Sequence, residues 1–196
     1  MKVGKHKITT ESIIDLDFNQ LLEGNTIDIL YSDPPWGNGN LKYWVTINKK
    51  QTGKDFKVIS YDELLNRFKT LIKTYTKGYV FIECSVKDLD ALEQALGGVL
   101  TNIKKFVTRY PGGKNGLFIG GTEPRFNFTK DMTGATGFKQ VNDCISSCPG
   151  EIVCDPTCGY GWTAKAAIKN GKTFIGNEFN KIRAERTIKE LQKDGL

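Results

Sequence analysis

Continuous apolar runs alternate along this chain with segments in which apolar residues recur every three or four positions. Continuous runs are typical of strands buried on both faces of a sheet, and the longer spacing is typical of helices with one buried face. The expected strands cover residues 27–32, 78–84, 103–109, 116–119, 151–155 and 172–176. The expected helices cover residues 60–75, 86–96, 162–170 and 181–193. This alternation predicts an α/β fold with a mostly parallel sheet and helices on both of its faces.

Two long stretches follow neither pattern. Residues 37–58 are rich in Lys and Asn, and residues 110–142 are rich in Gly, Thr and Phe. We expect both to be irregular, and loops of this length within a compact domain are commonly functional.

The composition is that of an ordinary globular protein, with 39% hydrophobic and 26% charged residues. A length of 196 residues suits a single domain, to which we assign residues 1–196. No apolar run is long enough to span a membrane, and no apolar core follows the basic N-terminus as it would in a secretory signal. The formal net charge of +6 favours a polyanionic partner.

Five cysteines without any sign of secretion indicate reduced thiols and a cytoplasmic protein. Four of them cluster in the sequence, at Cys144, Cys148, Cys154 and Cys158. Their spacing matches no standard zinc ribbon or finger, and the single histidine, His6, lies far from them. We therefore expect no metal site.

A glycine-containing turn follows the strand expected at 151–155 and precedes a helix. Gly159, Gly161 and Ala164 have the spacing G-x-G-x-x-A. The first permits a tight turn, the second lets a ligand approach the backbone, and the third allows close packing of the helix. Glu178 ends the next strand, where a carboxylate can bind both hydroxyls of a ribose. Together these features predict a nucleotide-type cofactor site.

The charge of this unit favours one cofactor over another. A dinucleotide would place its pyrophosphate at the start of the helix, and Asp155, at the head of the turn, would repel it. S-adenosylmethionine carries an ammonium and a sulfonium group, and its ribose suits Glu178. The two acids therefore favour S-adenosylmethionine over NAD.

A second turn, Asp33-Pro34-Pro35-Trp36, follows the strand expected at 27–32, where open α/β sheets bind ligands. The lone pair of an aromatic amine is delocalised into its ring, and two acceptors for the amino hydrogens localise it on nitrogen. The Asp33 carboxylate and the Pro34 carbonyl can be those acceptors, because the prolines stiffen the turn and remove two N–H donors. Trp36 offers a flat face to a base, a contact worth about 1–3 kcal/mol. The turn predicts methylation of an exocyclic amino group.

These motifs resemble those of N6-adenine and related amino methyltransferases. Residues 33–36 are similar to the catalytic signature of the family, 155–161 to its cofactor motif, and 176–178 to its Gly-x-Glu. The catalytic motif comes first, as in the permuted, β-type DNA methyltransferases and the eukaryotic mRNA adenosine methyltransferases. The resemblance implies a Rossmann-like class I S-adenosylmethionine methyltransferase fold of about seven strands, one of them antiparallel near the edge.

The resemblance also implies cofactor contacts, with departures from the family pattern. Thr157 replaces a Phe, and the usual Lys-Pro pair before residue 151 is absent, so we assign Thr136 and Lys139 to its place. The cofactor-binding residues implied are Asp33, Thr136, Lys139, Asp155, Thr157, Cys158, Gly159, Gly161, Thr163 and Glu178. The chain has little room for the family's inserted target-recognition domain, which indicates short or relaxed sequence specificity.

Residues 37–58 leave directly from the catalytic turn and interleave basic with aromatic side chains. This pattern suits a single strand or a base flipped out of a duplex. The expected substrate contacts of this loop and its turn are Trp36, Lys42, Tyr43, Trp44, Lys49 and Lys50. Basic residues of the last helix, Arg183 among them, are expected on a solvated face because acids lie beside them.

The sequence thus predicts an enzyme that methylates N6 of adenine in nucleic acid, with DNA favoured over RNA. RNA adenine and N4 of cytosine stay open as targets, although Asp33 favours adenine because Ser is more usual in the cytosine relatives. The same residue disfavours glutamine methyltransferases, whose similar motif begins with Asn. A non-catalytic nucleic-acid-binding subunit also stays open, as does a homodimer or a partner subunit that supplies specificity.

Overall fold

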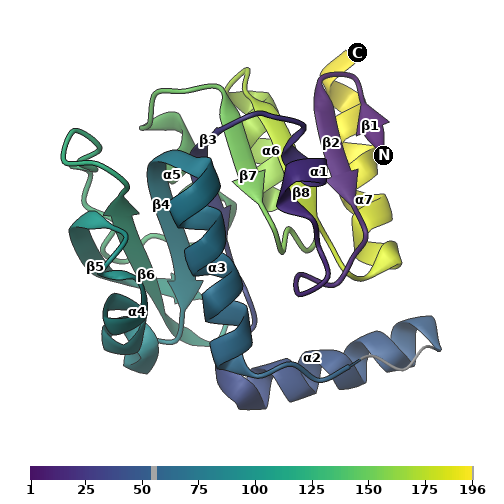
Figure 1. Ribbon diagram of the computed structural model, residues 1–196, viewed down its shortest axis with the longest axis horizontal. Coiled ribbons are helices and arrows are strands. Elements are labelled where there is room, and N and C mark those ends of the chain that lie inside the picture. Colours follow the sequence, from purple (N-terminus) through teal and green to yellow (C-terminus); the bar gives the residue numbers. More distant parts are fainter. Residues whose placement is uncertain (54–56, 196) are drawn as a thin grey trace.

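The computed structural model describes residues 1–53 and 57–195. Within these residues the strands form one eight-stranded sheet in the order β1-β2-β8-β7-β3-β4-β6-β5 (Figure 1). The strands are β1 (Lys2–Val3), β2 (His6–Thr9), β3 (Ile27–Ser32), β4 (Thr76–Cys84), β5 (Thr101–Tyr110), β6 (Gly113–Gly121), β7 (Ile152–Asp155) and β8 (Thr173–Asn177). The α-helices are α1 (Phe18–Leu22), α2 (Gly37–Thr52), α3 (Tyr61–Tyr75), α4 (Leu89–Leu96), α5 (Gly137–Ser146), α6 (Trp162–Lys169) and α7 (Lys181–Leu191), with 3-10 turns η1 (Val86–Asp88) and η2 (Gln192–Gly195).

Helices cover both faces of the sheet, as the sequence predicted. On one face α1, α3 and α4 build a hydrophobic core that includes Phe68 and Leu92. On the other face α5, α6 and α7 build a second core that includes Ile145 and Ala167. Figure 1 shows that α2 lies apart from both layers and crosses the lower end of the molecule.

The direction of the strand order reverses in the middle of the sheet. β3 and β7 are parallel neighbours, with Ile29 opposite Val153 and Leu30 opposite Cys154. From β7 the chain passes through α6 to β8 on one side, and from β3 it passes through α3 to β4 on the other. Since α3 and α6 cover opposite faces, a crevice opens beyond the carboxyl ends of β3 and β7, the usual ligand site of such sheets.

One strand near the edge runs against its neighbours, because β6 pairs antiparallel with both β4 and β5. The α/β class, the mostly parallel sheet and the antiparallel strand near the edge are therefore confirmed. The expected count of about seven strands is too low. Two N-terminal strands extend the sheet beside β8, and β1 has only two residues, too few to show an apolar pattern.

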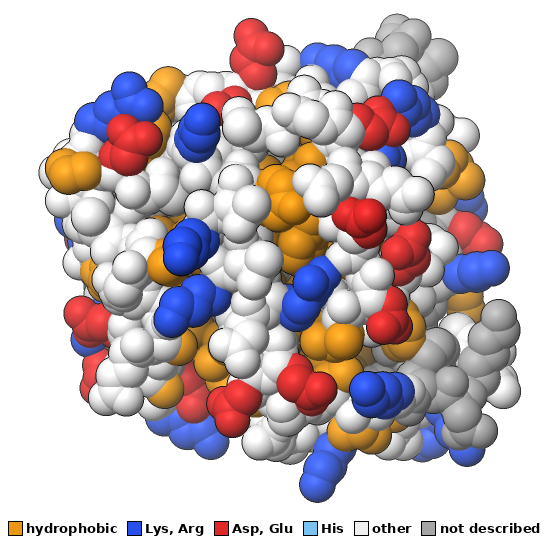
Figure 2. All heavy atoms as spheres, viewed as in Figure 1, with side chains coloured by type: hydrophobic (Ala, Val, Ile, Leu, Met, Phe, Trp, Pro, Cys, Tyr) orange, Lys and Arg blue, Asp and Glu red, His pale blue; other side chains and the backbone are white. Residues whose placement is uncertain are grey.

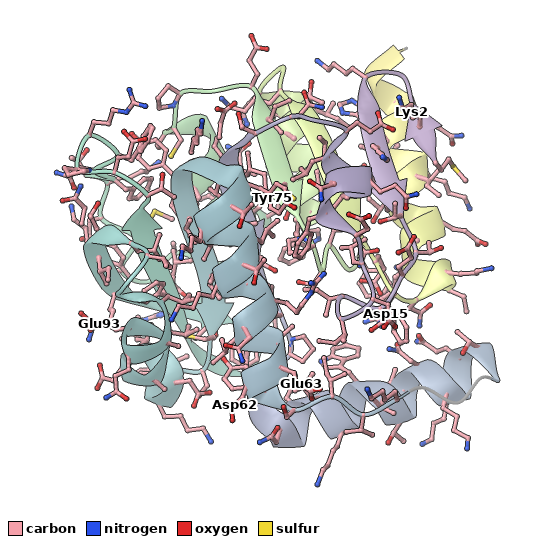
Figure 3. The ribbon with its side chains drawn as sticks, viewed as in Figure 1. Lys2, Asp15, Asp62, Glu63, Tyr75 and Glu93 are labelled. Carbon is pink, nitrogen blue, oxygen red and sulfur yellow. The ribbon has the colours of Figure 1, made fainter. Side chains whose placement is uncertain are left out.

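The start of α3 follows its sequence signal. Ser60 Oγ accepts a hydrogen bond from the Glu63 N–H at 3.1 Å, and the Glu63 carboxylate accepts one from the Ser60 N–H at 2.7 Å. This reciprocal pair is a capping box, which satisfies two of the unpaired donors at a helix start. Figure 3 labels Glu63 at the end of α3 nearest α2 and Tyr75 at the opposite end.

The expectation of a loop at 37–58 is wrong for most of its length. Residues 37–52 form the helix α2, whereas 54–56 lie outside the described residues. Two side chains of α2 are buried, Leu41 and the polar Asn48. The apolar stripe on its inner side is therefore short, and a polar residue ends it, which makes its helical pattern weak. Gly37 and Gly39 also lower the helix propensity of its first turn.

The second stretch expected to be irregular, 110–142, is irregular only in its middle. The strand expected at 116–119 is β6, which already begins at Gly113, and α5 begins at Gly137. The buried apolar side of α5 lies toward its end, at Val141 and Ile145. Because the stretch expected to be irregular ends at residue 142, it does not contain enough of this side to show the helical spacing.

Charged side chains on the face shown in Figure 2 are of both signs and interspersed, so the positive net charge does not form a single patch there. All five cysteines are buried and none forms a disulfide. Among the described residues, no three His, Cys, Asp or Glu side chains are grouped as they would be around a metal ion. No described helix is long and apolar enough to cross a membrane.

Candidate active site

The two sequence motifs meet at the carboxyl ends of β3 and β7. The hydroxyl oxygens of Ser32, which ends β3, and Thr157, which follows β7, lie 2.6 Å apart. Both turns line one cavity of about 620 Å³, a size typical of small-molecule sites. The residues that the two motifs and the end of β8 contribute to this cavity are Asp33, Pro34, Pro35, Trp36, Asp155, Pro156, Thr157, Cys158, Gly159, Tyr160, Trp162, Thr163, Asn177 and Glu178.

The two glycines of the turn after β7 have different roles. Both have positive φ, +54° for Gly159 and +84° for Gly161, which side chains rarely adopt. A Cβ on Gly159 would meet nothing within 4 Å, whereas a Cβ on Gly161 would lie 2.8 Å from Thr187 Oγ1. Gly159 therefore leaves open space beside the backbone, whereas the absent side chain of Gly161 lets the turn contact α7. The space that the sequence analysis expected at Gly161 lies at Gly159, which lines the cavity.

Asp155 is buried at the head of the turn. Its Oδ2 accepts a hydrogen bond from the Thr163 hydroxyl at 2.6 Å, and its Oδ1 accepts one from the Thr157 N–H at 3.0 Å. Burial and, to a smaller extent, the negative charge of Glu178 together raise the pKa of Asp155 to about 7, against the opposing effect of these hydrogen bonds. A positive ligand nearby would favour the ionised form.

Glu178 is buried directly after β8. Its Oε2 accepts a hydrogen bond from the Gly159 N–H at 2.9 Å, its Oε1 accepts one from the Asn180 N–H at 2.8 Å, and Arg183 Nε lies 3.2 Å from Oε1. Burial raises the pKa of Glu178, and the charge of Arg183 opposes that rise. Because a carboxylate oxygen can accept two hydrogen bonds, Glu178 can still receive hydroxyl donors from the cavity.

Asp33 faces the cavity from the turn after β3. The indole N–H of Trp36 donates a hydrogen bond to Asp33 Oδ1 at 3.1 Å. The surrounding protein raises the pKa of Asp33 although the cavity admits solvent to its side chain, and the negative charges of Glu83 and Asp155 raise it further. A cation bound nearby would therefore reduce the electrostatic repulsion between the Asp33 carboxylate and these two acids.

Glu83 is a cavity residue that sequence reasoning missed. Its Oε1 accepts a hydrogen bond from the Tyr31 hydroxyl at 2.6 Å, and its Oε2 accepts one from the Asn115 amide at 2.7 Å. Burial raises the pKa of Glu83. A signal for it was present, because an acid interrupts the apolar run 81–84 at the carboxyl end of an expected strand.

The hairpin between β5 and β6 forms another wall of the cavity. Arg109, Tyr110 and Pro111 line it, and the rings of Tyr110 and Trp36 meet edge to face with centroids 6.0 Å apart. The Arg109 N–H donates a hydrogen bond to the Ala135 carbonyl at 2.8 Å, which anchors the hairpin close to its turn. Tyr110 was not predicted as a site residue because it begins the stretch that was expected to be irregular.

The residues expected to contact substrate do not all reach the cavity. Trp36 and the half-buried Trp44 line it. The other four are exposed on α2 and are not among the described residues lining the cavity: Lys42, Tyr43, Lys49 and Lys50.

Thr136 and Lys139, which were expected to replace the family's Lys-Pro pair, are also not among the described residues that line the cavity. Lys139 forms an ion pair with Asp143 at 2.6 Å within α5, and Thr136 precedes that helix, although its neighbour Gly137 does line the cavity. Arg183 of the last helix is buried at 8% exposure rather than solvated, which corrects the expectation for that residue.

The charges of the cavity favour a cationic ligand. Asp33, Glu83, Asp155 and Glu178 line it together with three basic residues, Lys57, Arg109 and Arg183, and the pKa of each of the four carboxyl groups is raised, mainly by loss of hydration. Bringing a positive group among four such carboxylates relieves their mutual repulsion, whereas a pyrophosphate would increase it. This donor set fits the ammonium, sulfonium and ribose hydroxyls of S-adenosylmethionine.

No known family model matches the sequence, and no curated protein matches it. Solved structures do match the fold. M1.HpyAVI superposes on 94% of this chain and 98% of its own with 19% identity and a TM-score of 0.62, and a second match is its complex with SAM. TTHA0409 from Thermus thermophilus, described as a candidate DNA modification methylase, covers 96% of this chain and 95% of its own at 13% identity and a TM-score of 0.66. The PvuII DNA methyltransferase, described as cytosine-N4-specific, covers 98% and 95% at 12% identity and a TM-score of 0.58. The chain shares the Rossmann-like fold of these proteins.

Proposed function

We propose that this protein is an S-adenosylmethionine-dependent methyltransferase that acts on the exocyclic amino group of a nucleic-acid base, with N6 of adenine in DNA as its target. The observation that carries the proposal is the shared cavity. The turn at 33–36 and the turn at 155–161 both line it, although they are far apart in the sequence. The fold shared with solved DNA methyltransferases supports the same activity.

The residues around the cavity can hold the cofactor at one side and the base at the other. S-adenosylmethionine supplies an electrophilic methyl group on a positively charged sulfur. Glu178 receives its ribose hydroxyls, Gly159 leaves room for it beside the backbone, and Asp155 adds a negative charge near its positive end. Held by these residues, the cofactor would supply the methyl group to a base bound at the turn after β3.

The turn after β3 prepares the amino group. Because the Trp36 indole donates to Asp33 Oδ1, the other oxygen, Oδ2, is available to accept an amino hydrogen. The Pro34 carbonyl accepts the second hydrogen, and the nitrogen lone pair then points toward the methyl group. Trp36 stacks on the base, and holding both reactants in this orientation removes much of the entropic part of the barrier.

The assignment to adenine rests on Asp33 at the head of the catalytic turn. The PvuII enzyme shares the fold and is named for cytosine N4, so the fold alone fits either base. Incubation with labelled cofactor and single-stranded or duplex DNA and RNA, followed by nucleoside analysis, identifies the methylated base and polymer. N6-methyladenine in DNA is expected, and label only in N4-methylcytosine or only in RNA would contradict that part of the proposal.

Replacing Asp33 tests the catalytic assignment. The variant Asp33→Ala removes an acceptor for the amino hydrogens, and we expect kcat to fall by on the order of 100-fold or more while cofactor binding survives. Asp62→Ala, at an exposed position on α3, is the matched control and should leave both quantities unchanged. Wild-type turnover by the Asp33 variant would refute the assignment.

A further inference from the structure

A buried polar network joins α2 to α7 at the rim of the cavity. Asn48 of α2 is 5% exposed, and its Oδ1 accepts hydrogen bonds from the Asn180 amide at 3.0 Å and from the Arg183 guanidinium. The Asn180 amide also donates to Gln51 Oε1 at 2.6 Å. Since α2 has few buried apolar side chains, these polar contacts are a main part of what fixes it to the rest of the molecule.

The Arg183 guanidinium is the centre of this network. It lies 4.7 Å from the centroid of the Trp44 ring, over its face, and its Nε lies 3.2 Å from Glu178 Oε1. Arg183 is 8% exposed, so its charge depends on these partners rather than on water. Moving α2 away would remove the Trp44 ring and the Asn48 oxygen from the guanidinium, while the ion pair with Glu178 would stay.

The same network reaches the cofactor side of the cavity. Glu178 accepts the Gly159 N–H, and Trp44, Asn48, Glu178 and Arg183 all line the cavity. A continuous series of contacts therefore runs from the glycine turn through Glu178 and Arg183 to α2. Hydroxyl donors that bind Glu178 favour its ionised form, and an ionised Glu178 holds Arg183 more strongly.

We propose that Arg183 is a positioning residue that couples the cofactor site to α2, so that cofactor bound at Glu178 fixes Trp44 and α2 in the arrangement that receives nucleic acid. This inference rests on the proposed function and adds a regulation to it. Coupling between two sites is reciprocal, so bound nucleic acid must tighten cofactor binding by the same factor.

The coupling is measured with S-adenosylhomocysteine, which cannot transfer a methyl group, and a labelled oligonucleotide of the polymer that the enzyme methylates. The oligonucleotide Kd is measured with and without S-adenosylhomocysteine, and the reverse titration checks reciprocity. For the wild type we expect the first ligand to tighten the second by about 5- to 150-fold. For Arg183→Gln we expect this factor to fall toward one.

Two further variants separate coupling from folding. Trp44→Leu removes the ring contact but leaves the Arg183–Glu178 ion pair, so it should reduce the coupling factor while retaining more cofactor affinity than Arg183→Gln. Lys189→Gln removes a positive charge from an exposed position on the same helix and should change nothing. Thermal unfolding of each variant shows whether it remains folded.

The outcomes distinguish this inference from the proposed function. If the wild type binds no S-adenosylhomocysteine, or no nucleic acid, the proposed function fails and the coupling falls with it. If the wild type binds both but the two ligands are independent, or if Arg183→Gln and Trp44→Leu lower only the unfolding temperature and leave the coupling factor intact, the inference alone is overturned.

Discussion

Asp155 makes the cavity sensitive to pH near neutrality. Its pKa of about 7 means that it is mostly protonated at pH 6 and mostly ionised at pH 8. If the ionised form alone attracts the cationic cofactor, cofactor affinity should rise roughly tenfold over this interval. Isothermal titration calorimetry at pH 6, 7 and 8 measures this change.

The variant Asp155→Asn is the control for this titration. The residue keeps its shape and loses its charge, so the variant should bind cofactor weakly and with a much smaller pH dependence. A wild-type affinity that stays constant, or falls, between pH 6 and 8 would contradict the role given to Asp155.

A rise in pH has the opposite effect, through Asp155, on the stability of the cofactor-free protein. The pKa of Asp155 is raised from 3.8 to about 7, so between these values the folded state binds more protons at Asp155 than the unfolded state. Its contribution to the free energy of unfolding therefore falls as pH rises through this window. Cofactor bound beside Asp155 should offset that loss at neutral pH.

Some site residues could be predicted from the sequence and others could not. Asp33, Asp155 and Glu178 belong to short segments in which the residue type and the end of a strand occur together, and all three line the cavity. Glu83 has only the weak signal of a single acid at the end of an apolar run, and Tyr110 has no local motif. Their position depends on the pairing of β4, β5 and β6, which is a property of the folded sheet.

At the scale of elements, the turn between β7 and α6 offers a matched pair of glycine variants. Gly161→Ala would place Cβ 2.8 Å from Thr187 Oγ1 at a φ of +84°, and we expect it to lower the free energy of unfolding by about 1–3 kcal/mol. Gly159→Ala adds Cβ to open space at a φ of +54°, so we expect a smaller loss of stability but weaker cofactor binding, because the methyl group enters the cavity. Urea unfolding without cofactor and calorimetric titration measure the two effects.

The pair is informative because the chemical change is the same at both positions. If Gly159→Ala bound cofactor like the wild type, the cofactor would not pass close to this turn. If Gly161→Ala were as stable as the wild type, the contact between the turn and α7 would not limit the packing there.

Elements with a strong apolar pattern could be predicted, and elements held by polar contacts could not. α3 has both a capping box and buried residues at helical spacing, and its bounds nearly match the expected ones. α2 begins without a side-chain cap, and its buried side combines the apolar Leu41 with the polar Asn48. Its helical state depends on partners in α7, more than 130 residues later in the chain.

At the scale of the whole molecule, the net charge of +6 should contribute to nucleic-acid binding mainly where it lies near the cavity. Lys42 and Lys50 are exposed on α2, beside the cavity. We expect the double variant Lys42→Glu/Lys50→Glu to weaken binding and to reduce the slope of log K against log salt by about 0.7–0.9 for each phosphate group that is no longer neutralised. Fluorescence anisotropy over a range of salt concentrations measures this slope.

The control changes the net charge equally at another place. Lys69 and Lys73 are exposed on α3, which covers one face of the sheet. Lys69→Glu/Lys73→Glu should leave the salt slope close to that of the wild type. Equal effects of the two double variants would mean that α2 provides only unspecific attraction.

The strand order has a consequence for how the protein folds during its synthesis on the ribosome. The hydroxyl contact between Ser32 and Thr157 joins residues 125 positions apart. At roughly 5–20 residues per second, on the order of 6–25 seconds pass between the synthesis of Ser32 and that of Thr157. Throughout that interval the backbone N–H and C=O groups of β3 that later pair with β7 lack this partner, so the nascent chain should depend on chaperones until β7 emerges.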